Sequence, residues 1–265
     1  MEIITDTVKT IIAKAMVMKN KVDFSKLNLV DCHSHFIHEV DDGSTSLEAS
    51  LNMIDEEINS GVTSIICTPH YRSGMFEASN EVININFNIL KEEVNKKYPN
   101  VNLYLGREIY VHSMEGSVRR LLDRISTGYV RGINDTNNYL LEFSYTKEID
   151  ISEVSYALAS KGYQPIIAHI ERYQYIDDIN KVEDIKNTRA LIQVNASCIL
   201  GKDVNRKKQR FILKLIKLGL VDMVASDIHE YRKNYMKEAF LFVYDKFGEN
   251  VALDLFKNNP SRLLN

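Results

Sequence analysis

The sequence contains few of the residues that interrupt regular structure. Its 265 residues include no tryptophan, four prolines and eleven glycines, which argues against a long flexible linker. Neither sign of charge dominates, because 33 Lys and Arg face 36 Asp and Glu for a formal net charge of −3. No global positive field exists to attract nucleic acid, so we expect no nucleic-acid partner. The 45% hydrophobic and 26% charged fractions exclude a disordered, fibrous or membrane-bundle chain.

Cysteine is also sparse. Cys32, Cys67 and Cys198 lie far apart in or beside apolar runs and form no CxxC pair, which indicates reduced, mostly buried thiols in a cytoplasmic protein. A cysteine-dependent phosphatase needs an arginine after five intervening residues, and those positions hold His38, Ser73 and Val204. That mechanism is therefore excluded. No HExxH, GxSxG, GxGxxG or P-loop pattern occurs either.

The apolar residues near the amino terminus do not form a membrane span. The stretch from Ile11 to Met18 is too short to cross a bilayer, contains Lys14, and is not followed by a small-residue cleavage site. We therefore expect no transmembrane segment. Apolar residues here recur at helical spacing, which predicts that residues 1–27 form a helical extension packed on the body or on a second subunit, so an oligomer is possible. A helix lying on a membrane surface is the alternative.

From residue 28 onward, short apolar runs alternate with longer amphipathic segments. The runs begin about every 32 residues, close to the ~31 residues of one strand–helix unit in a barrel of 250 residues. Such alternation is typical of a parallel sheet, and continuously apolar strands indicate burial on both faces. We predict one α/β domain over residues 28–265, a distorted TIM-like (β/α)7 barrel, with an open doubly wound sheet as the alternative. The predicted strands are Leu29–Cys32, Val62–Thr68, Leu103–Val111, Tyr139–Phe143, Pro165–Ile170, Ala190–Val194 and Met223–Ser226.

Helices are expected between these runs. The string Ser44-Thr45-Ser46-Leu47-Glu48 is similar to a capping box and predicts a helix that begins there and ends near Gly61. Amphipathic patterns predict further helices near residues 79–97, 151–161, 205–219 and 234–246.

Residues that can bind metal or transfer protons stand at the ends of six of the seven runs. Barrel active sites form where the carboxyl ends of successive strands meet, so this placement favours the barrel. Side chains alternate along a strand, so His33 and His35 can both face the barrel mouth, as can Asp227 and His229. A lone histidine would more often be a core residue, but imidazoles and carboxylates together suit zinc, iron or manganese. The candidate ligands are His33, His35, His70, Glu108, Glu142, His169, Asp227 and His229.

Several strings together resemble one family. They are HxHxxxxxDDG over residues 33–43, TPH over 68–70, GRE over 106–108, HIERY over 169–173, SDIH over 226–229 and NPSRLL over 259–264. Over residues 28–265 the chain resembles the PHP-superfamily (polymerase and histidinol phosphatase) metallophosphatases. The resemblance is closest to the bacterial manganese-dependent protein-tyrosine phosphatases of capsule and exopolysaccharide operons. The first 27 residues depart from the usual start of this family, so the resemblance implies no role for them.

The resemblance implies the PHP fold and three divalent metal ions, which would be manganese, with iron or zinc as alternatives. The first ion would be held by His33, His35, Glu108 and Asp227. The second would share Glu108 and add Glu142 and His169, and the third would be held by Asp42, His70 and His229. Three divalent ions bring about +6 against about −4 from the four carboxylates, so the site would attract a phosphate dianion.

The implied activity is hydrolysis of phosphotyrosine in a protein, by family the tyrosine-rich tail of a bacterial tyrosine kinase that regulates capsular or exopolysaccharide synthesis. A phenolate leaving group, with a conjugate-acid pKa near ~10, needs less help from a general acid than an alkoxide does. The alternatives are another PHP phosphoesterase acting on histidinol phosphate or a nucleotide, a nuclease disfavoured by the net charge, or a metal-binding scaffold of a polysaccharide assembly complex.

Four arginines lie near the candidate ligands in the sequence. Arg172 is predicted to contact the phosphate, with Arg72 and Arg232 behind it, and an ion pair of Arg172 with a neighbouring acid is the alternative. Arg107 adjoins Glu108 and should therefore point to the opposite face, where we expect it to form a structural salt bridge.

Overall fold

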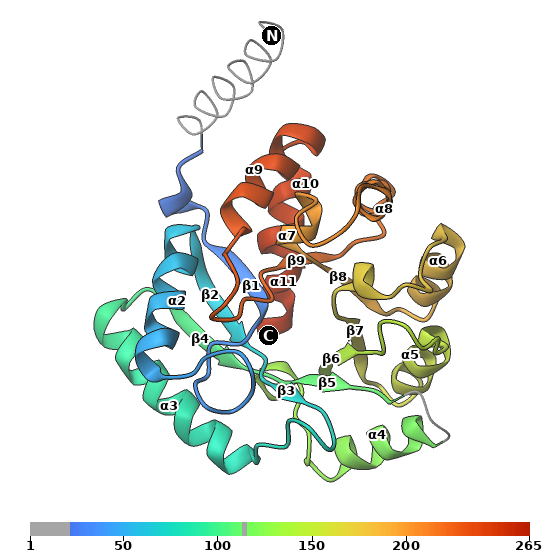
Figure 1. The fold of residues 1–265 in the computed structure, drawn as a ribbon, viewed down its shortest axis with the longest axis horizontal. Helices are drawn as coiled ribbons and strands as arrows, with labels where there is room; N and C mark the ends of the chain where they lie inside the picture. Colours follow the sequence, from blue (N-terminus) through green and yellow to red (C-terminus); the bar gives the residue numbers. More distant parts are fainter. Residues whose placement is uncertain (1–21, 113–115) are drawn as a thin grey trace, which may run out of the picture.

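The computed structural model describes residues 22–112 and 116–265, which alternate strands and helices along the chain (Figure 1). The helix predicted within residues 1–27 falls mostly on residues 1–21, which lie outside the described residues. The part of that segment that is described, residues 22–27, contains the 3-10 turn η1 (Phe24–Lys26). There the ring of Phe24 packs edge-on against Phe240 at 5.6 Å between centroids. These residues therefore pack on the body, while the boundary at residue 27 stays a prediction.

Parallel strands form the centre of the molecule. One sheet has the order β1 (Leu29–Ser34), β2 (Val62–Cys67), β4 (Asn102–Leu105). The other has the order β3 (His70–Tyr71), β5 (Glu108–Tyr110), β6 (Asn138–Glu142), β7 (Gln164–Ile167), β8 (Leu191–Asn195), β9 (Met223–Ala225). Each of these neighbouring pairs runs parallel. The alternation of apolar runs therefore predicted the strands' direction correctly.

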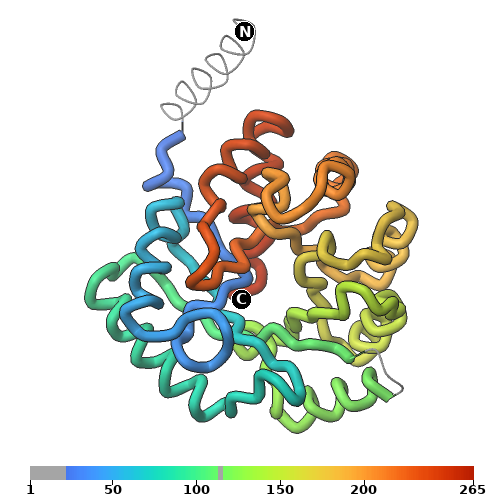
Figure 2. The backbone as a smooth tube through the Cα atoms, viewed as in Figure 1, coloured from blue at the N-terminus to red at the C-terminus, as the bar shows by residue number. Residues whose placement is uncertain are grey.

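The two sheets curl into one barrel. β4 pairs with β2 whereas β5 pairs with β6, so the short Gly106-Arg107 break between them carries the chain from one sheet to the other. At the opposite edge, a parallel bridge joins Ser34 at the end of β1 to Ile228 just after β9. Figure 2 shows the backbone travelling once around the barrel in sequence order, so its last part returns beside its first. The predicted TIM-like barrel is confirmed.

One predicted strand differs in detail. The run Leu103–Val111 is two strands, because the backbone leaves the first sheet at Gly106. The amide of Gly106 donates to the carbonyl of Cys67 at 2.8 Å. A Cβ at Gly106 would lie 3.0 Å from Cγ1 of Ile133, so the chain passes too close to its neighbour for a larger residue. The short strand β3 was not predicted.

Helices surround the strands (Figure 1). The predicted ones are confirmed as α2 (Leu47–Asn59), α3 (Asn80–Lys97), α5 (Ile151–Ala159), α8 (Arg206–Lys217) and α9 (Met236–Phe247). The hydroxyl of Ser46 caps α2 by accepting from the amide of Ala49 at 3.1 Å, as the capping-box string indicated. The remaining elements are α4 (Ser117–Ser126), η2 (Ile133–Asp135), η3 (Ile170–Arg172), α6 (Ile179–Asn187), α7 (Ala196–Ile199), α10 (Glu249–Leu253), the π-helix η4 (Asp254–Asn258), α11 (Asn259–Ser261) and η5 (Arg262–Leu264).

Apolar side chains fill the barrel interior. This inner cluster is separate from the larger core between strands and helices and comprises Cys32, Ile66, Ile133, Leu140, Ile166, Ala168, Met223, Ala225 and Leu263. Leu263 comes from the carboxyl-terminal segment, which is held there by a hydrogen bond of 3.1 Å from Nδ2 of Asn134 to the carbonyl of Leu264. The three cysteines are free and buried, as predicted. Burial of each of the larger side chains, such as Ile66 and Leu263, contributes about 1.5–3 kcal/mol, so the interior is a solid support and not a channel.

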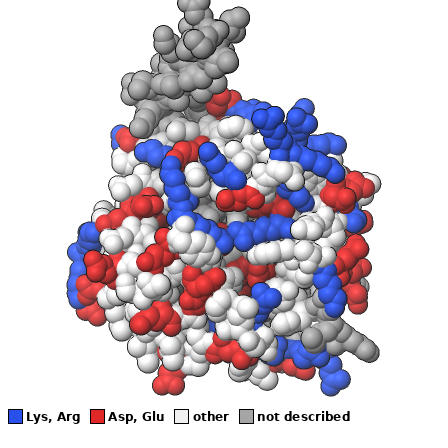
Figure 3. All heavy atoms as spheres, viewed as in Figure 1, with Lys and Arg blue, Asp and Glu red and all other residues white. Residues whose placement is uncertain are grey.

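Acidic and basic side chains are unevenly distributed over the surface, although their total charges nearly balance. Acidic and basic side chains are interspersed over most of the face in Figure 3, but basic ones gather over α8. The sequence of α8, RKKQRFILKLIK, contains no acidic residue. Among the described helices, none combines the length and the apolar character that a bilayer crossing would require.

Candidate metal centre

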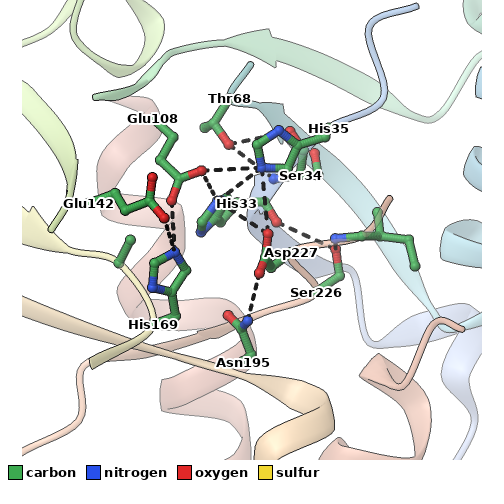
Figure 4. Close-up of polar contacts among 12 residues, drawn as sticks. His33, Ser34, His35, Thr68, Glu108, Glu142, His169, Asn195, Ser226 and Asp227 are labelled. Atoms are coloured by element: carbon green, nitrogen blue, oxygen red, sulfur yellow. Dashed lines mark hydrogen bonds and ion pairs between the residues drawn. The ribbon is translucent and has the colours of Figure 1, made fainter. Parts of the chain in front are cut away.

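All nine predicted ligands lie in one network of contacts at the carboxyl ends of the strands. His33 and His35 come from the end of β1, Glu108 begins β5, Glu142 ends β6, and Asp227 follows β9. Figure 4 shows these side chains, with His169, pointing toward one another from different strands. Asp42, His70 and His229 continue the network outward. Residues up to 196 positions apart in the chain, from His33 to His229, therefore meet as the strand-end positions predicted.

Glu108 is the centre of this network. Its Oε2 lies 3.1 Å from Nε2 of His33, 3.3 Å from Nε2 of His35 and 2.9 Å from Nδ1 of His70. Its Oε1 lies 2.8 Å from Nε2 of His169. Burial alone would raise the pKa of Glu108, but the charges of His33 and His70 outweigh it and hold that pKa well below the usual range. The two oxygens of Glu108 thus face different imidazoles, the arrangement that a bridging ligand requires.

Two of the candidate ligands have a left-handed backbone conformation. His169 has a φ of 30° and Asp227 a φ of 49°, which L-residues adopt at a cost of about 1–3 kcal/mol. At His169 the amide donates to Oε1 of Gln193 at 2.7 Å, and at Asp227 the amide donates to the carbonyl of His33 at 2.9 Å. The conformation aims both side chains inward at the strand ends. Backbone strain is therefore stored where the ligand atoms converge.

The outer part of the site is more open. Oδ1 of Asp42 lies 3.5 Å from Nε2 of His70 and 3.6 Å from Nε2 of His229. The side chain of Asp42 is 46% exposed and that of His70 14%, whereas those of His33, His35 and Glu108 are fully buried. The centre therefore has a buried inner part and an outer part that reaches solvent.

Several supporting residues were missed by the sequence argument. Oε1 of Gln193 lies 3.2 Å from Nδ1 of His33, and Nδ1 of His35 lies 2.8 Å from Oδ2 of Asp41. Nδ2 of Asn195 donates to Oδ2 of Asp227 at 2.7 Å. Gln193 and Asn195 belong to β8, whose run ends without a metal-binding residue. Their i, i+2 spacing at that strand end was the available signal, because amides there share the face of the ligands.

The outer nitrogens of the imidazoles face hydrogen-bond acceptors, as in a cation site. Oε1 of Gln193 and Oδ2 of Asp41 can only accept, so with an ion bound the Nδ1 atoms of His33 and His35 would carry the hydrogen and their Nε2 atoms, which face Glu108, would be the ligand atoms. The Nδ1 of His229 likewise lies 3.1 Å from the carbonyl of Asp227, which leaves its Nε2 facing Asp42. This hydrogen-bonding of the far nitrogen is the usual support of metal-binding imidazoles.

Electrostatics support the same conclusion. Burial would lower the pKa of His35, but the charge of Asp41 and hydrogen bonds to Asp227, Asp41 and Glu108 raise it well above its ordinary value. A field that favours a proton on a buried imidazole also favours a metal cation.

Three groups of side chains bring their ligand atoms within 4.8 Å of one another: His33, His35 and Glu108; His70, Glu108 and Glu142; and His35, His70 and His229. The first group lies within the set implied for the first ion, while the other two divide the ligands differently from the resemblance.

The arginines differ in their positions. Nη2 of Arg172 donates to Oδ2 of Asp227 at 2.8 Å, and Nη1 of Arg232 donates to the same oxygen at 2.9 Å. Arg72 instead lies over the ring of Tyr110, 4.2 Å from its centroid. Two of the three predicted arginines are thus brought to the inner site, and Arg72 is held beside an aromatic ring.

The prediction for Arg107 is half wrong. The residue is buried and structural, but it donates to the carbonyls of Ala78 at 3.0 Å and His70 at 2.9 Å and makes no salt bridge with any described residue. The two carbonyls accept from the guanidinium where an acid was expected, and they fix the segment that carries His70.

Comparison with known proteins identifies the family. The model of the family described as capsular polysaccharide synthesis, CpsB/CapC, matches residues 29–265. A tyrosine-protein phosphatase CpsB of Streptococcus agalactiae is 34% identical over 244 residues, which cover 89% of this chain and 98% of the relative. The tyrosine-protein phosphatase YwqE of Bacillus subtilis is 27% identical over 241 residues, which cover 89% of this chain and 92% of YwqE.

Solved structures agree with this assignment. A chain from the crystal structures of YwqE from Bacillus subtilis and CpsB from Streptococcus pneumoniae, described as unique metal-dependent tyrosine phosphatases, matches with a TM-score of 0.78 and 25% identity over 89% of this chain and 94% of that one. An amidohydrolase from Mycoplasma synoviae shares the fold at a TM-score of 0.63 and 15% identity, covering 92% of this chain and 89% of its own. The chain therefore belongs to the CpsB/CapC family of capsular polysaccharide synthesis.

Proposed function

We propose that this chain is a metal-dependent tyrosine phosphatase that hydrolyses phosphotyrosine and acts in capsular or exopolysaccharide synthesis. The observation that carries the proposal is the contact network of nine histidines and carboxylates at the barrel mouth, in a chain whose relatives are named tyrosine-protein phosphatases. The imidazole and carboxylate set supports divalent ions, because the far nitrogens of His33, His35 and His229 each face a hydrogen-bond acceptor.

The proposed metal content is three divalent ions. His33, His35, Glu108 and Asp227 would hold one, Glu142 and His169 would join Glu108 on another, and Asp42, His70 and His229 would hold a third. Manganese is the proposed metal, since hard carboxylate oxygens mix here with imidazole, and iron or zinc are the alternatives. When bound, such ions supply positive charge for the phosphoryl oxygens and a water whose pKa is lowered toward ~7.

The proposed phosphate contacts are Arg172 and Arg232, with Arg72 behind them. Both Arg172 and Arg232 are partly exposed while donating to Asp227, so their remaining N–H groups can reach an incoming phosphoryl oxygen. Arg172 also donates to the hydroxyl of Tyr145 at 3.2 Å, and Tyr145 donates to Oε1 of Glu142 at 2.6 Å. Burial raises the pKa of Tyr145, which keeps its phenol protonated and able to orient Glu142.

The proposed substrate is a phosphotyrosine protein, in particular the tyrosine-rich tail of a bacterial tyrosine kinase. A phenolate departs with less protonation than an alkoxide, and this supports an aryl ester in a site whose catalysis depends on cations. The proposed compartment is the cytoplasm, which suits three free buried cysteines. No nucleic-acid partner is proposed.

The test is turnover of a phosphotyrosine peptide before and after exhaustive chelation. We expect chelation to abolish activity and added Mn²⁺ to restore it, with metal analysis of the purified protein reporting which ions it holds. Histidinol phosphate and a nucleoside monophosphate assayed in parallel separate this function from other phosphoesterases. Full turnover by the chelated protein would contradict metal dependence, and a preference for either alternative substrate would contradict the proposed activity.

A further inference from the structure

The open side of the centre determines where a substrate's leaving group must lie. The inner ligands are fully buried, and exposure begins at Asp42 and His70. Because exposure of the ligands is greatest there, we place the ester oxygen and the attached group of a phosphate ester past the outer part formed by Asp42, His70 and His229. Side chains that flank this outer part are the ones that a leaving group meets first.

Two aromatic rings flank the outer histidines. Phe76 stacks on His70 with 5.2 Å between ring centroids and 13° between planes. Tyr231 lies 5.4 Å from His229 at 50°. Between them the imidazoles follow one another, with His35 at 4.3 Å from His70 and 4.2 Å from His229. The ring contacts therefore run from Phe76 through His70, the buried His35 and His229 to Tyr231.

Both rings are carried by short, ordered segments. Phe76 belongs to a turn closed by the antiparallel bridge between Arg72 and Phe76, whose backbone amides and carbonyls exchange hydrogen bonds of 2.9 Å. Tyr231 follows His229 in the loop after β9, where the amide of Arg232 donates to the carbonyl of His229 at 2.9 Å. The backbone that carries each ring is therefore held close to the imidazole beside it.

We propose that Phe76 and Tyr231 form a subsite for the aromatic ring of the leaving group, so that the centre selects aryl over alkyl phosphates. This inference rests on the proposed phosphatase function. Tyr231 is 68% exposed, so it packs too little to serve chiefly as support for His229 and leaves an aromatic face for a ligand. Ring stacking adds about two- to tenfold in affinity beyond burial, enough to rank ligands that carry the same phosphoryl group.

The experiment compares two inert phosphonates by calorimetry on the manganese-loaded chain. Benzylphosphonate and methylphosphonate present the same charged group, but only the first has a ring. We expect benzylphosphonate to bind about tenfold more tightly, and Tyr231→Ala and Phe76→Leu each to reduce this ratio about threefold or more. Tyr231→Phe keeps the ring and should keep the ratio. Tyr156→Ala, on α5 and equally exposed at 67%, is the matched control and should match the parent.

Metal content and turnover separate the possible failures. If Tyr231→Ala or Phe76→Leu loses metal and weakens both phosphonates equally, the rings only position the histidines and the subsite is wrong. Equal affinity of the parent for both phosphonates would also overturn it, even with rapid turnover of phosphotyrosine peptide. Absence of that turnover in the metal-loaded parent would instead contradict the proposed function on which the subsite rests.

Discussion

Two fully buried glutamates in this chain have opposite surroundings. Glu108 lies among the imidazoles of the metal centre, while Glu57, on α2, accepts a hydrogen bond from Nδ2 of Asn234 and leaves its other oxygen without a partner among the described residues. Burial pushes both pKa values upward. At Glu108 the charges of His33 and His70 reverse the effect, whereas at Glu57 the charge of Asp31 adds to it, so its pKa is well above the ordinary value.

The comparison shows that burial of an acid does not by itself mark a functional site. Burial costs free energy in either place, and the neighbours decide whether the acid is charged. Around Glu108 four histidines stabilise the negative charge of the carboxylate. A bound cation would stabilise that charge in the same way. Around Glu57 the hydrogen bond from Asn234 offsets only part of the cost, so we infer that the acid is neutral and structural. Substitutions at the two positions should therefore have opposite consequences.

The largest difference is expected from Glu108→Gln. The amide keeps the shape of the side chain but loses the charge and one of the two acceptor oxygens that face separate imidazoles. We expect a loss of phosphotyrosine-peptide turnover of more than ~10³-fold, together with a reduced metal content. Kinetic assay and metal analysis of the same preparation check this. A variant with near-normal rate and metal content would show that Glu108 does not bridge two ions.

A smaller effect on metal binding is expected when a residue that supports the histidines around Glu108 is replaced. Gln193→Leu removes the acceptor that lies 3.2 Å from Nδ1 of His33 and the partner of the His169 amide. We expect metal affinity to fall about 10–100-fold, because both imidazoles lose their orientation. Gln164→Leu, at the amino-terminal start of the neighbouring strand β7, is the control. Unchanged affinity in the Gln193 variant would mean that the ligands hold themselves in place.

The sequence predicted the inner site better than its supports. Strand periodicity located the ends of the strands, and the histidines and acids there stood out because such residues are rare in apolar runs. Gln193 and Asn195 stood out less, because a neutral amide at a strand end is ordinary in any protein and only their i, i+2 spacing set them apart. The split at Gly106 was also hidden, because an apolar run records burial and not the choice of partner strand. The local basic concentration over α8 was masked by the balanced total charge.

The loop that carries Asp41 and Asp42 should affect both the stability of the fold and the metal centre. A Cβ on Gly43 would collide with Cβ and the carbonyl oxygen of His35 and lie 2.9 Å from Oδ1 of Asp41. We therefore expect Gly43→Ala to lower the free energy of unfolding by about 1–3 kcal/mol and to displace His35 from Glu108. Denaturant unfolding with metal analysis measures both. Normal stability and metal content would show that the loop moves aside without cost.

The smallest effect is expected at Glu57, and it should be a gain. Because its pKa is raised in the folded chain, Glu57 binds its proton more tightly there than in the unfolded chain, where the pKa is near 4.5. Stability from this group is therefore complete below about pH 4.5 and falls as the pH rises toward the folded-state pKa. Glu57→Gln removes that titration and keeps an acceptor for Asn234, so we expect unfolding to require about 1 kcal/mol more at pH 7 and the advantage to shrink toward pH 4.5. Glu56→Gln, exposed on the same helix, should change little. If Glu57→Gln destabilised the chain at neutral pH, Glu57 would be a needed charge, and the contrast with Glu108 would fail.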